Sequence, residues 1–268
     1  LIALFISTSL MAQRHSRRGH HKEYDPAIYL ISVHEVDTLM NDCQARQELA
    51  LLNRLSAESA IADHQQTTRQ GWHQPTLPEF ILASRGNRFS LAVGGAIVFK
   101  TNYDFEGIVD SREFRTSAIP MSEGYNNRQQ LLMDATSSYL YLKAIGNTRL
   151  GRVVVYVDAN FKGGESGSYT PHVRSAYVSM GGFTAGRDIT TFCDITAAAP
   201  TIDYRGPNAY NSRYTTLLRY EHSMWRDIFS FGLAAEMPEV SATYGDYFAP
   251  LRQRMPDFPI YLQVAWGS

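Results

Sequence analysis

The sequence predicts an all-β fold, an antiparallel transmembrane β-barrel of about eight strands that is partial and is preceded by an N-terminal α-helical segment. Three observations predict it. From residue 88 onward, apolar residues recur at every second position, which is the period of a strand with one polar and one apolar face. Short turns alternate with long polar or glycine-rich connections. No later stretch reaches the about 18 uninterrupted apolar residues of a membrane-spanning helix, which excludes a helical membrane protein.

The first 12 residues resemble the end of a secretory signal peptide. The apolar run LIALFI opens the sequence, and LMAQ closes the segment, with Ala12 as the small residue before the cleavage site. A buried N-terminal strand or short helix is the alternative. Since the chain begins at Leu1 without a basic leader, we expect that its true N-terminus is missing. Residues 13–34 are polar and basic, and we expect them to form a flexible segment.

Residues 35–70 are rich in helix formers and almost free of glycine and proline, which predicts a helix. Its apolar stripe is interrupted by Arg46 and Asn53, so a coiled coil is left open as an alternative. Two prolines then predict an extended linker over 71–87, ahead of the partial barrel at 88–268.

The expected strands show alternation residue by residue. Val153, Val155 and Val157 fall on one face of their segment, while Tyr156 and Asp158 fall on the other. Eight segments behave in this way: 89–102, 139–144, 152–161, 172–179, 182–187, 213–222, 229–236 and 260–266. Tight turns join some of them, and long connections are expected at 105–136, 162–171, 188–212 and 237–258. A soluble β-sandwich is the structural alternative.

No catalytic signature is present, and we expect a protein that is not an enzyme and needs no cofactor or metal. Ser175 and His172 come nearest to a nucleophile and its base, but three positions apart on a strand they fall on opposite faces. The net charge of −1 argues against a nucleic-acid partner.

The remaining chemistry is electrostatic. Between residues 137 and 220, nine Lys and Arg stand against five Asp and Glu, a local balance of +4. An Arg or Lys that faced lipid at mid-bilayer would cost roughly 2–4 kcal/mol, so these side chains must face the lumen or the membrane rim. The alternative is that some arginines pair with carboxylates such as Asp158 or Glu221 and brace the wall. The candidate pore-lining residues are Lys100, Lys143, Arg152, Asp158, Arg174, Arg187, Arg213 and Arg219.

The connection at 188–212 is too long for a simple turn. We expect it to fold inward and narrow the pore, with Asp194, Asp203 and Arg205 as the charges of the constriction. An ordinary outward-facing surface loop is the alternative.

Four motifs together resemble the DcaP-like outer-membrane porin family. They are GFTAGR at 182–187, TFCD at 191–194, PTIDYRGP at 200–207 and RYTTLLRY at 213–220. In the family, a strand that ends in A-G-[QR] leads through a T/S-F-x-D segment and P-x-x-[DL]-[FY]-x-G-P to a strand led by arginine. The resemblance covers about 88–236 and is most specific over 172–220.

The resemblance implies a homotrimeric porin in the bacterial outer membrane, with its N-terminal helical segment in the periplasm. It implies passive passage of small anionic solutes such as dicarboxylates, so that the expected partners are the lipid bilayer, these solutes and further copies of the chain. The family's chains continue through many more strands, and we therefore expect this chain to be incomplete at its C-terminal end as well. A small eight-stranded outer-membrane barrel that anchors the envelope or binds a partner is the alternative function.

Overall fold

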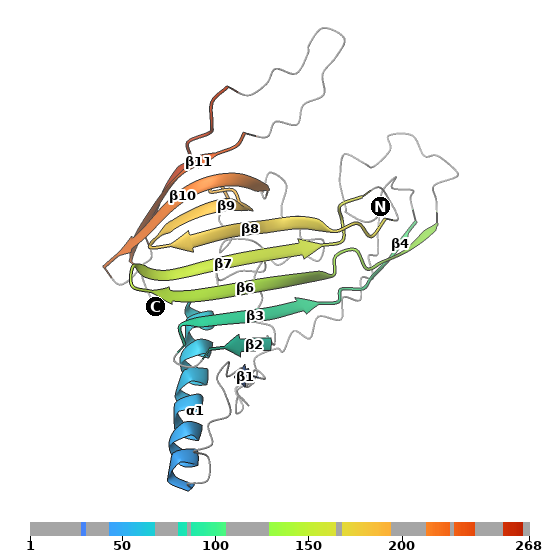
Figure 1. Cartoon of the computed structure of the whole chain (residues 1–268). Coiled ribbons are helices and arrows are strands. Elements are labelled where there is room, and N and C mark those ends of the chain that lie inside the picture. Colours follow the sequence, from blue (N-terminus) through green and yellow to red (C-terminus); the bar gives the residue numbers. More distant parts are fainter. Residues whose placement is uncertain are drawn as a thin grey trace.

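The computed structural model describes residues 28–30, 43–67, 80–84, 87–105, 129–164, 168–193, 213–225, 228–238 and 254–264. For 28–30 and 43–50 it describes the backbone alone. The described part of the chain consists of a ten-stranded sheet, a two-stranded sheet and one helix (Figure 1).

The large sheet follows the chain order. Its strands are β1 (Ile28–Leu30), β2 (Phe80–Ala83), β3 (Phe89–Ala96), β6 (Tyr139–Thr148), β7 (Gly151–Asn160), β8 (His172–Met180), β9 (Phe183–Ile189), β10 (Tyr214–Met224), β11 (Phe229–Glu236) and β12 (Ile260–Val264). Only β1 and β2 pair in parallel; every later pair is antiparallel. The small sheet pairs β4 (Lys100–Asp104) with β5 (Gln130–Asp134). The prediction of an antiparallel, mostly β fold behind a helix is confirmed.

The number of strands differs from the prediction. Each of the eight expected segments holds a strand, but 89–102 is divided between β3 and β4. Three strands were not expected: β1 within the segment 13–34, β2 within the linker 71–87, and β5 within the long connection 105–136. These strands have three to five residues, which is too short for alternation to stand out, and pairing with neighbouring strands stabilises them.

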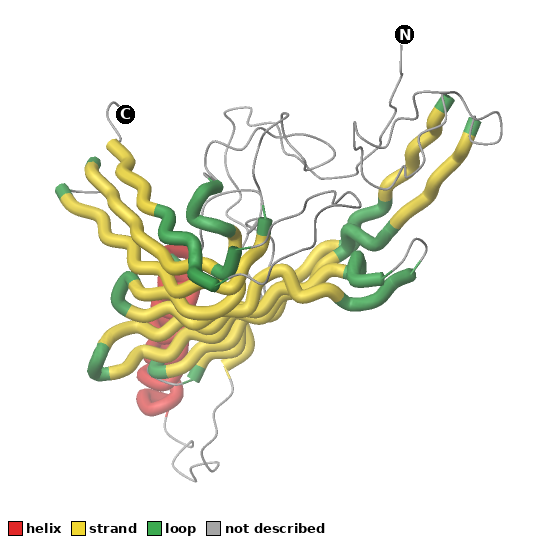
Figure 2. Tube along the Cα trace, turned by 90° about the horizontal axis from the view of Figure 1, so that it is seen from above, coloured by secondary structure: helices red, strands yellow, loops and turns green. Residues whose placement is uncertain are grey.

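The sheet curves into a wall without closing. β1 and β12 are its edge strands, so the described strands form an open, curved sheet rather than a closed barrel (Figure 2). Short turns join β2 to β3, β6 to β7 and β8 to β9 at one end of the strands. We call this side of the sheet the short-turn edge. The turn between β8 and β9 uses Gly181 and Gly182, whose φ angles of 56° and 90° suit glycine. At the opposite edge, Ile189 at the end of β9 pairs with Tyr214 at the start of β10, so the chain leaves and re-enters the sheet there on either side of the long connection.

Helix α1 (Cys43–Gln66) lies within the predicted range 35–70 and runs across the strands rather than along them (Figure 1). Ala60, near its end, packs against Ile81, Ala83 and Ala92 of β2 and β3. None of the helices in the described ranges has the length and apolar character needed to span a bilayer. The expected signal segment 1–12 lies outside the described residues, and the periplasmic location and coiled coil of the helix stay predictions.

Candidate functional site

The strands sort their side chains between two faces, and the register shows this directly. One cross-strand row runs Ala92, Lys143, Tyr156, Tyr177, Gly186, Leu217 and Glu236 from β3 to β11. Apart from the partly exposed Gly186, every member of this row is buried. We call the face that carries this row the inner face.

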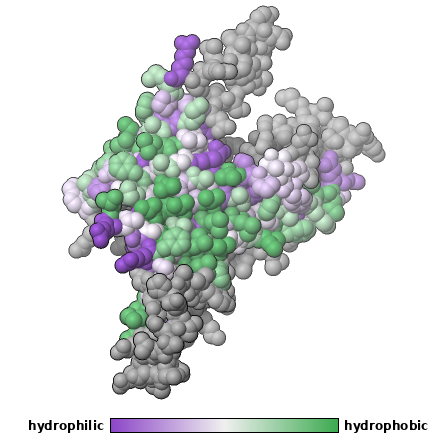
Figure 3. Space-filling view, in the orientation of Figure 1, coloured by the Kyte–Doolittle hydropathy of each residue, from purple (hydrophilic) through white to green (hydrophobic). Residues whose placement is uncertain are grey.

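The opposite, outer face is apolar and exposed. Its rows include Leu91, Ala144, Val155, Val178, Ala185, Leu218 and Ala235. Leu140 is 62% exposed, and Leu142, Val155, Val178 and Phe183 are exposed as well. Figure 3 shows apolar residues gathered over the strands of this face. The charged and hydroxyl-bearing residues of the inner face are instead buried, which is the reverse of a water-soluble protein.

Most of the predicted pore-lining residues lie on the inner face. Lys143, Arg152, Asp158, Arg174 and Arg219 all belong to it. Lys100 lies in the small sheet, directly across from Asp134, and both are buried. Arg213 precedes β10, and its guanidinium lies 3.8 Å from the carboxylate of Asp257.

Arg187 differs from the other predicted residues. Its direct neighbours across the strands are Ala176 and Thr216, in the outer row that also holds Leu142 and Val157. The register therefore places Arg187 on the face opposite to Lys143 and Arg219. The sequence argument failed here because it assigned the end of the strand to the polar side without a pairing partner to fix the phase.

A β-bulge brings Arg174 to the inner face. Across from β7, Asp158 pairs with Ser175 and Ala159 pairs with Val173, so Arg174 is the extra residue of β8. Its guanidinium holds both oxygens of Asp158, with Nη2 at 2.8 Å from Oδ1 and 2.6 Å from Oδ2. It also lies 5.0 Å from the ring centre of Tyr139. Without the bulge, Arg174 and Ser175 would lie on opposite faces.

Arg219 is the centre of a second charged cluster. It is 3% exposed, and its guanidinium lies 2.9 Å from Asp188 and 3.0 Å from Glu221. Ser175 donates a hydrogen bond to the other oxygen of Asp188 at 3.2 Å, and Tyr261 donates to Glu221 at 3.0 Å. The cluster links β8 to β12 through side chains.

Three tyrosines with adjacent rings form a cluster on the inner face. The ring centres of Tyr141 and Tyr156 are 5.9 Å apart, and those of Tyr156 and Tyr177 are 5.4 Å apart. Glycine opposite a tyrosine makes the room: a Cβ atom at Gly94 would lie 2.4 Å from the Tyr141 ring. The tyrosines thus fill the inside of the wall and fix its local packing.

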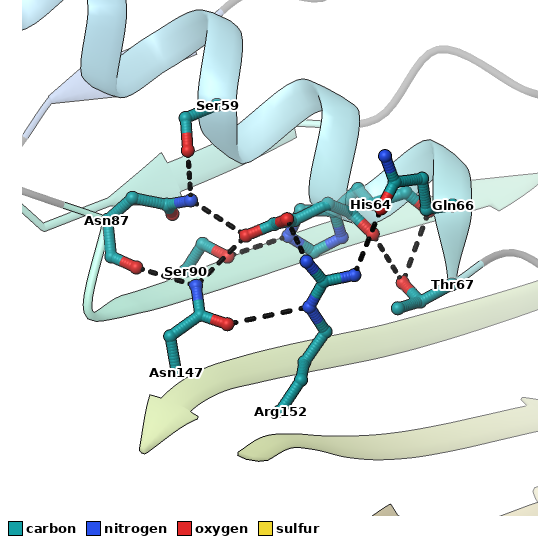
Figure 4. A network of polar contacts seen from close by, with 9 residues as sticks. Ser59, His64, Gln66, Thr67, Asn87, Ser90, Asn147 and Arg152 are labelled. Atoms are coloured by element: carbon teal, nitrogen blue, oxygen red, sulfur yellow. Dashed lines mark hydrogen bonds and ion pairs between the residues drawn. The ribbon is translucent and has the colours of Figure 1, made fainter. Parts of the chain in front are cut away.

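The end of α1 docks on the inner face at the short-turn edge (Figure 4). Asp63 accepts hydrogen bonds from Asn87 at 2.7 Å, from Asn147 at 2.9 Å and from Arg152 at 2.5 Å. Asn87 also donates to Ser59 at 2.7 Å. One carboxylate therefore connects the helix to the β2–β3 turn, to β6 and to β7.

Lys143 contacts the same helix end. Its ammonium donates to the main-chain carbonyl of His64 at 2.8 Å, near the negative end of the helix dipole. The side chain of His64 forms a hydrogen bond with Ser90 of β3 at 3.1 Å. Burial, with a further contribution from Lys143, lowers the pKa of His64 to about 4, so the imidazole is neutral at physiological pH.

The arrangement is a polar wall in which opposite charges are largely matched. Arg152, Arg174 and Arg219 each face a carboxylate, which is the bracing role that the sequence left open as an alternative. Sequence reasoning missed Asp63 and Asp188, because no motif links them to partners 89 and 31 residues away. The predicted constriction residues Asp194, Asp203 and Arg205 lie outside the described residues.

Comparison with known proteins agrees with this geometry. The model of the DcaP outer membrane protein family matches residues 85–231. Among solved structures, the crystal structure of the outer membrane channel DcaP of Acinetobacter baumannii is similar, with a TM-score of 0.52 and 16% sequence identity. The match covers 59% of this chain and 44% of that channel, so this chain corresponds to less than half of the channel's length. No curated protein sequence matches.

Proposed function

The chain belongs to the DcaP outer membrane protein family, and from this premise we propose that it acts as a porin, a passive diffusion channel for small anionic solutes. In this proposal the inner face lines the pore and the outer face contacts lipid. A passive channel makes and breaks no bond, so it needs neither a nucleophile nor a cofactor.

The observation that carries the proposal is the sorting of side chains between the two faces. Leu140 and Leu142 are exposed, while Lys143 on the same strand is 2% exposed and Arg219 on β10 is 3% exposed. In water this arrangement would leave a broad apolar surface in contact with solvent. In a bilayer it satisfies both faces, because lipid covers the apolar rows and the charged rows avoid a cost of roughly 2–4 kcal/mol for each Arg or Lys.

The preference for anions rests on the guanidinium groups of the inner face. An arginine has five N–H donors in a planar fork, and pairing with one carboxylate leaves some of them to a second acceptor. Arg152 suits this role best, since its side chain is 35% exposed although it is paired with Asp63. A dicarboxylate that passed along the wall would contact Arg152, while the buried Arg174 and Arg219 would act on it through their charge at a distance.

Further parts of the proposal extend the family resemblance. The connection at 188–212, with Asp194, Asp203 and Arg205, would set the size limit of the pore. Helix α1 would lie on the periplasmic side, because the short turns of outer-membrane barrels face the periplasm and α1 docks at the short-turn edge. Three copies of the complete protein would form a homotrimer.

Planar-bilayer recordings on the complete protein test the proposal. The wild type should conduct and should prefer chloride over potassium under a salt gradient. In the triple variant Arg152→Gln, Arg174→Gln, Arg219→Gln, the reversal potential should move toward cation preference, because three positive charges leave the inner face.

The control removes two charges away from the inner face, with Arg54→Gln and Arg187→Gln, and should leave the reversal potential near that of the wild type. Absence of any conductance would overturn the channel. An unchanged reversal potential in the first variant would remove the anion preference. Swelling of proteoliposomes in a dicarboxylate, compared with an uncharged sugar of similar size, then tests the solute class.

A further inference from the structure

One acidic side chain on the inner face does not come from a strand. Asp63 belongs to α1, and its carboxylate lies against the inner face at the short-turn edge. There it contacts the guanidinium of Arg152 from β7. We propose that Asp63 is a selectivity-determining residue of the channel: it neutralises Arg152 and thereby lowers the positive charge of the pore wall at this mouth. The inference rests on the proposed function of the inner face as the pore lining.

Asp63 is fixed in place by contacts on several sides. Both of its oxygens are used: Oδ1 accepts from Arg152, and Oδ2 accepts from Asn87 and Asn147. One turn earlier, Ala60 is fully buried against β2 and β3. A carboxylate held from three directions cannot swing away from Arg152 without breaking several hydrogen bonds, so its charge acts as a permanent part of the wall.

The second cation at this edge is also engaged with the helix. Lys143 donates to the carbonyl of His64, where the helix dipole presents partial negative charge. The cations farther from this edge pair with strand carboxylates instead, Arg174 with Asp158 and Arg219 with Asp188. Helix α1 is therefore the element that determines the charge of the short-turn mouth, and among its described side chains Asp63 brings a full negative charge against a cation of the inner face.

This position gives Asp63 influence over every passing ion. A solute within about 8 Å of the wall is inside the Debye length at physiological salt and responds to the sum of nearby charges. With Asp63 ionised, the pair with Arg152 contributes almost no net charge. With Asp63 uncharged, Arg152 would present a full positive charge at the mouth, and anions would be favoured more strongly.

A double-mutant cycle in planar bilayers tests the proposal. Asp63→Asn should raise the permeability ratio of anions to cations by roughly two- to five-fold. Arg152→Gln should lower that ratio by a similar factor, because it leaves Asp63 uncompensated. The double variant Asp63→Asn, Arg152→Gln should return close to the wild type. The control Glu58→Gln removes the same charge from an exposed position of α1, where Glu58 is paired with the exposed Arg54, and should leave the permeability ratio unchanged.

Hydrogen exchange at residues 61–67 accompanies each recording, because Asp63→Asn could release the helix. If it does, Asp63→Glu separates the two effects, because it disturbs the same hydrogen bonds but keeps the negative charge, and its ion preference should stay near that of the wild type. An ion preference that Asp63→Asn leaves unchanged overturns the role of Asp63 and leaves the channel standing. If the wild type shows no conductance, the proposed function is overturned instead.

Discussion

The clustered tyrosines show how single residues shape the wall. Tyr141 on β6 lies across from Gly94 on β3, and Tyr177 on β8 lies across from Gly186 on β9. The missing side chain of Gly94 makes space for the ring of Tyr141, and that of Gly186 lets its strand approach the backbone of Ala176 and Tyr177 closely. The sequence shows both residue types at strand positions but not which glycine faces which tyrosine, because that depends on the pairing of strands far apart in the chain.

A methyl group at position 94 should therefore destabilise the folded protein. Gly94→Ala places a Cβ atom 2.4 Å from the ring of the buried Tyr141, and we expect a loss of about 1–3 kcal/mol in the free energy of unfolding. Gly146→Ala is the matched control, since a Cβ there meets no atom within 4 Å. Urea unfolding in lipid vesicles measures both.

In a Tyr141→Ala background, Gly94→Ala should cost much less, because the ring with which it collides is gone. Equal costs in the two backgrounds would show that the glycine is needed for another reason.

At the scale of elements, helix α1 depends on the sheet for its final turn. Its carbonyl at His64 is bonded by Lys143, and its Asp63 is bonded by residues of three different strands and turns. A helix end otherwise leaves its last carbonyls without partners, so these contacts act as a cap supplied by the sheet. The sequence predicted the helix, and the docking could be known only from the fold.

Docking of α1 should weaken as the pH falls. The pKa of His64 is lowered from 6.5 to about 4 in the docked state by burial and by Lys143, against a smaller opposing effect of Asp63. A lowered pKa means that the undocked helix binds the proton more readily. The contribution of a neutral His64 is therefore complete above pH 6.5 and decreases as the pH falls from 6.5 to about 4.

Hydrogen exchange of residues 61–67, corrected for the intrinsic rate at each pH, should show this loss in the wild type. His64→Gln keeps a partner for Ser90 without titrating, and its protection should change less over the same range. An identical pH profile in the two proteins would assign the effect to another group.

The β8 bulge is the clearest case of an element that sequence periodicity misreads. Strict alternation places Ser175 and Arg174 on opposite faces, whereas the extra residue lets both serve the inner face, with Arg174 on Asp158 and Ser175 on Asp188. A bulge shifts the phase of alternation by one residue, and no local pattern in 172–179 marks it.

At the scale of the whole molecule, the two faces of the sheet differ in polarity, as expected for a sheet with lipid on one side and water on the other. Apart from Arg187 and its neighbour Thr216, the described outer rows are mainly apolar, and the inner rows hold the ion pairs, the tyrosines and the docked helix (Figure 3). The family and the fold both point to the outer membrane as the place where such a sheet is stable.

A charge placed on the outer face tests this view. Leu142→Arg should destabilise the protein in phospholipid vesicles by about 2–4 kcal/mol, because the guanidinium would face the hydrocarbon. Leu150→Arg is the matched control: the same substitution in the β6–β7 turn, where Leu150 is 88% exposed at the short-turn edge, should cost about 0–1 kcal/mol. Unfolding by urea, followed by tryptophan fluorescence, gives both values. Equal costs would mean that lipid does not cover this face.

The sequence by itself determined the class of the fold, most strand positions, the helix and the family, because alternation, turn residues and local motifs are properties of neighbouring residues. The tertiary structure alone decided which charges meet. It placed Asp63 on Arg152 and Asp188 on Arg219, moved Arg174 inward through a bulge, and left Arg187 on the outer face. Those outcomes depend on register and docking between segments far apart in the chain, and one residue of shift in a strand exchanges its two faces.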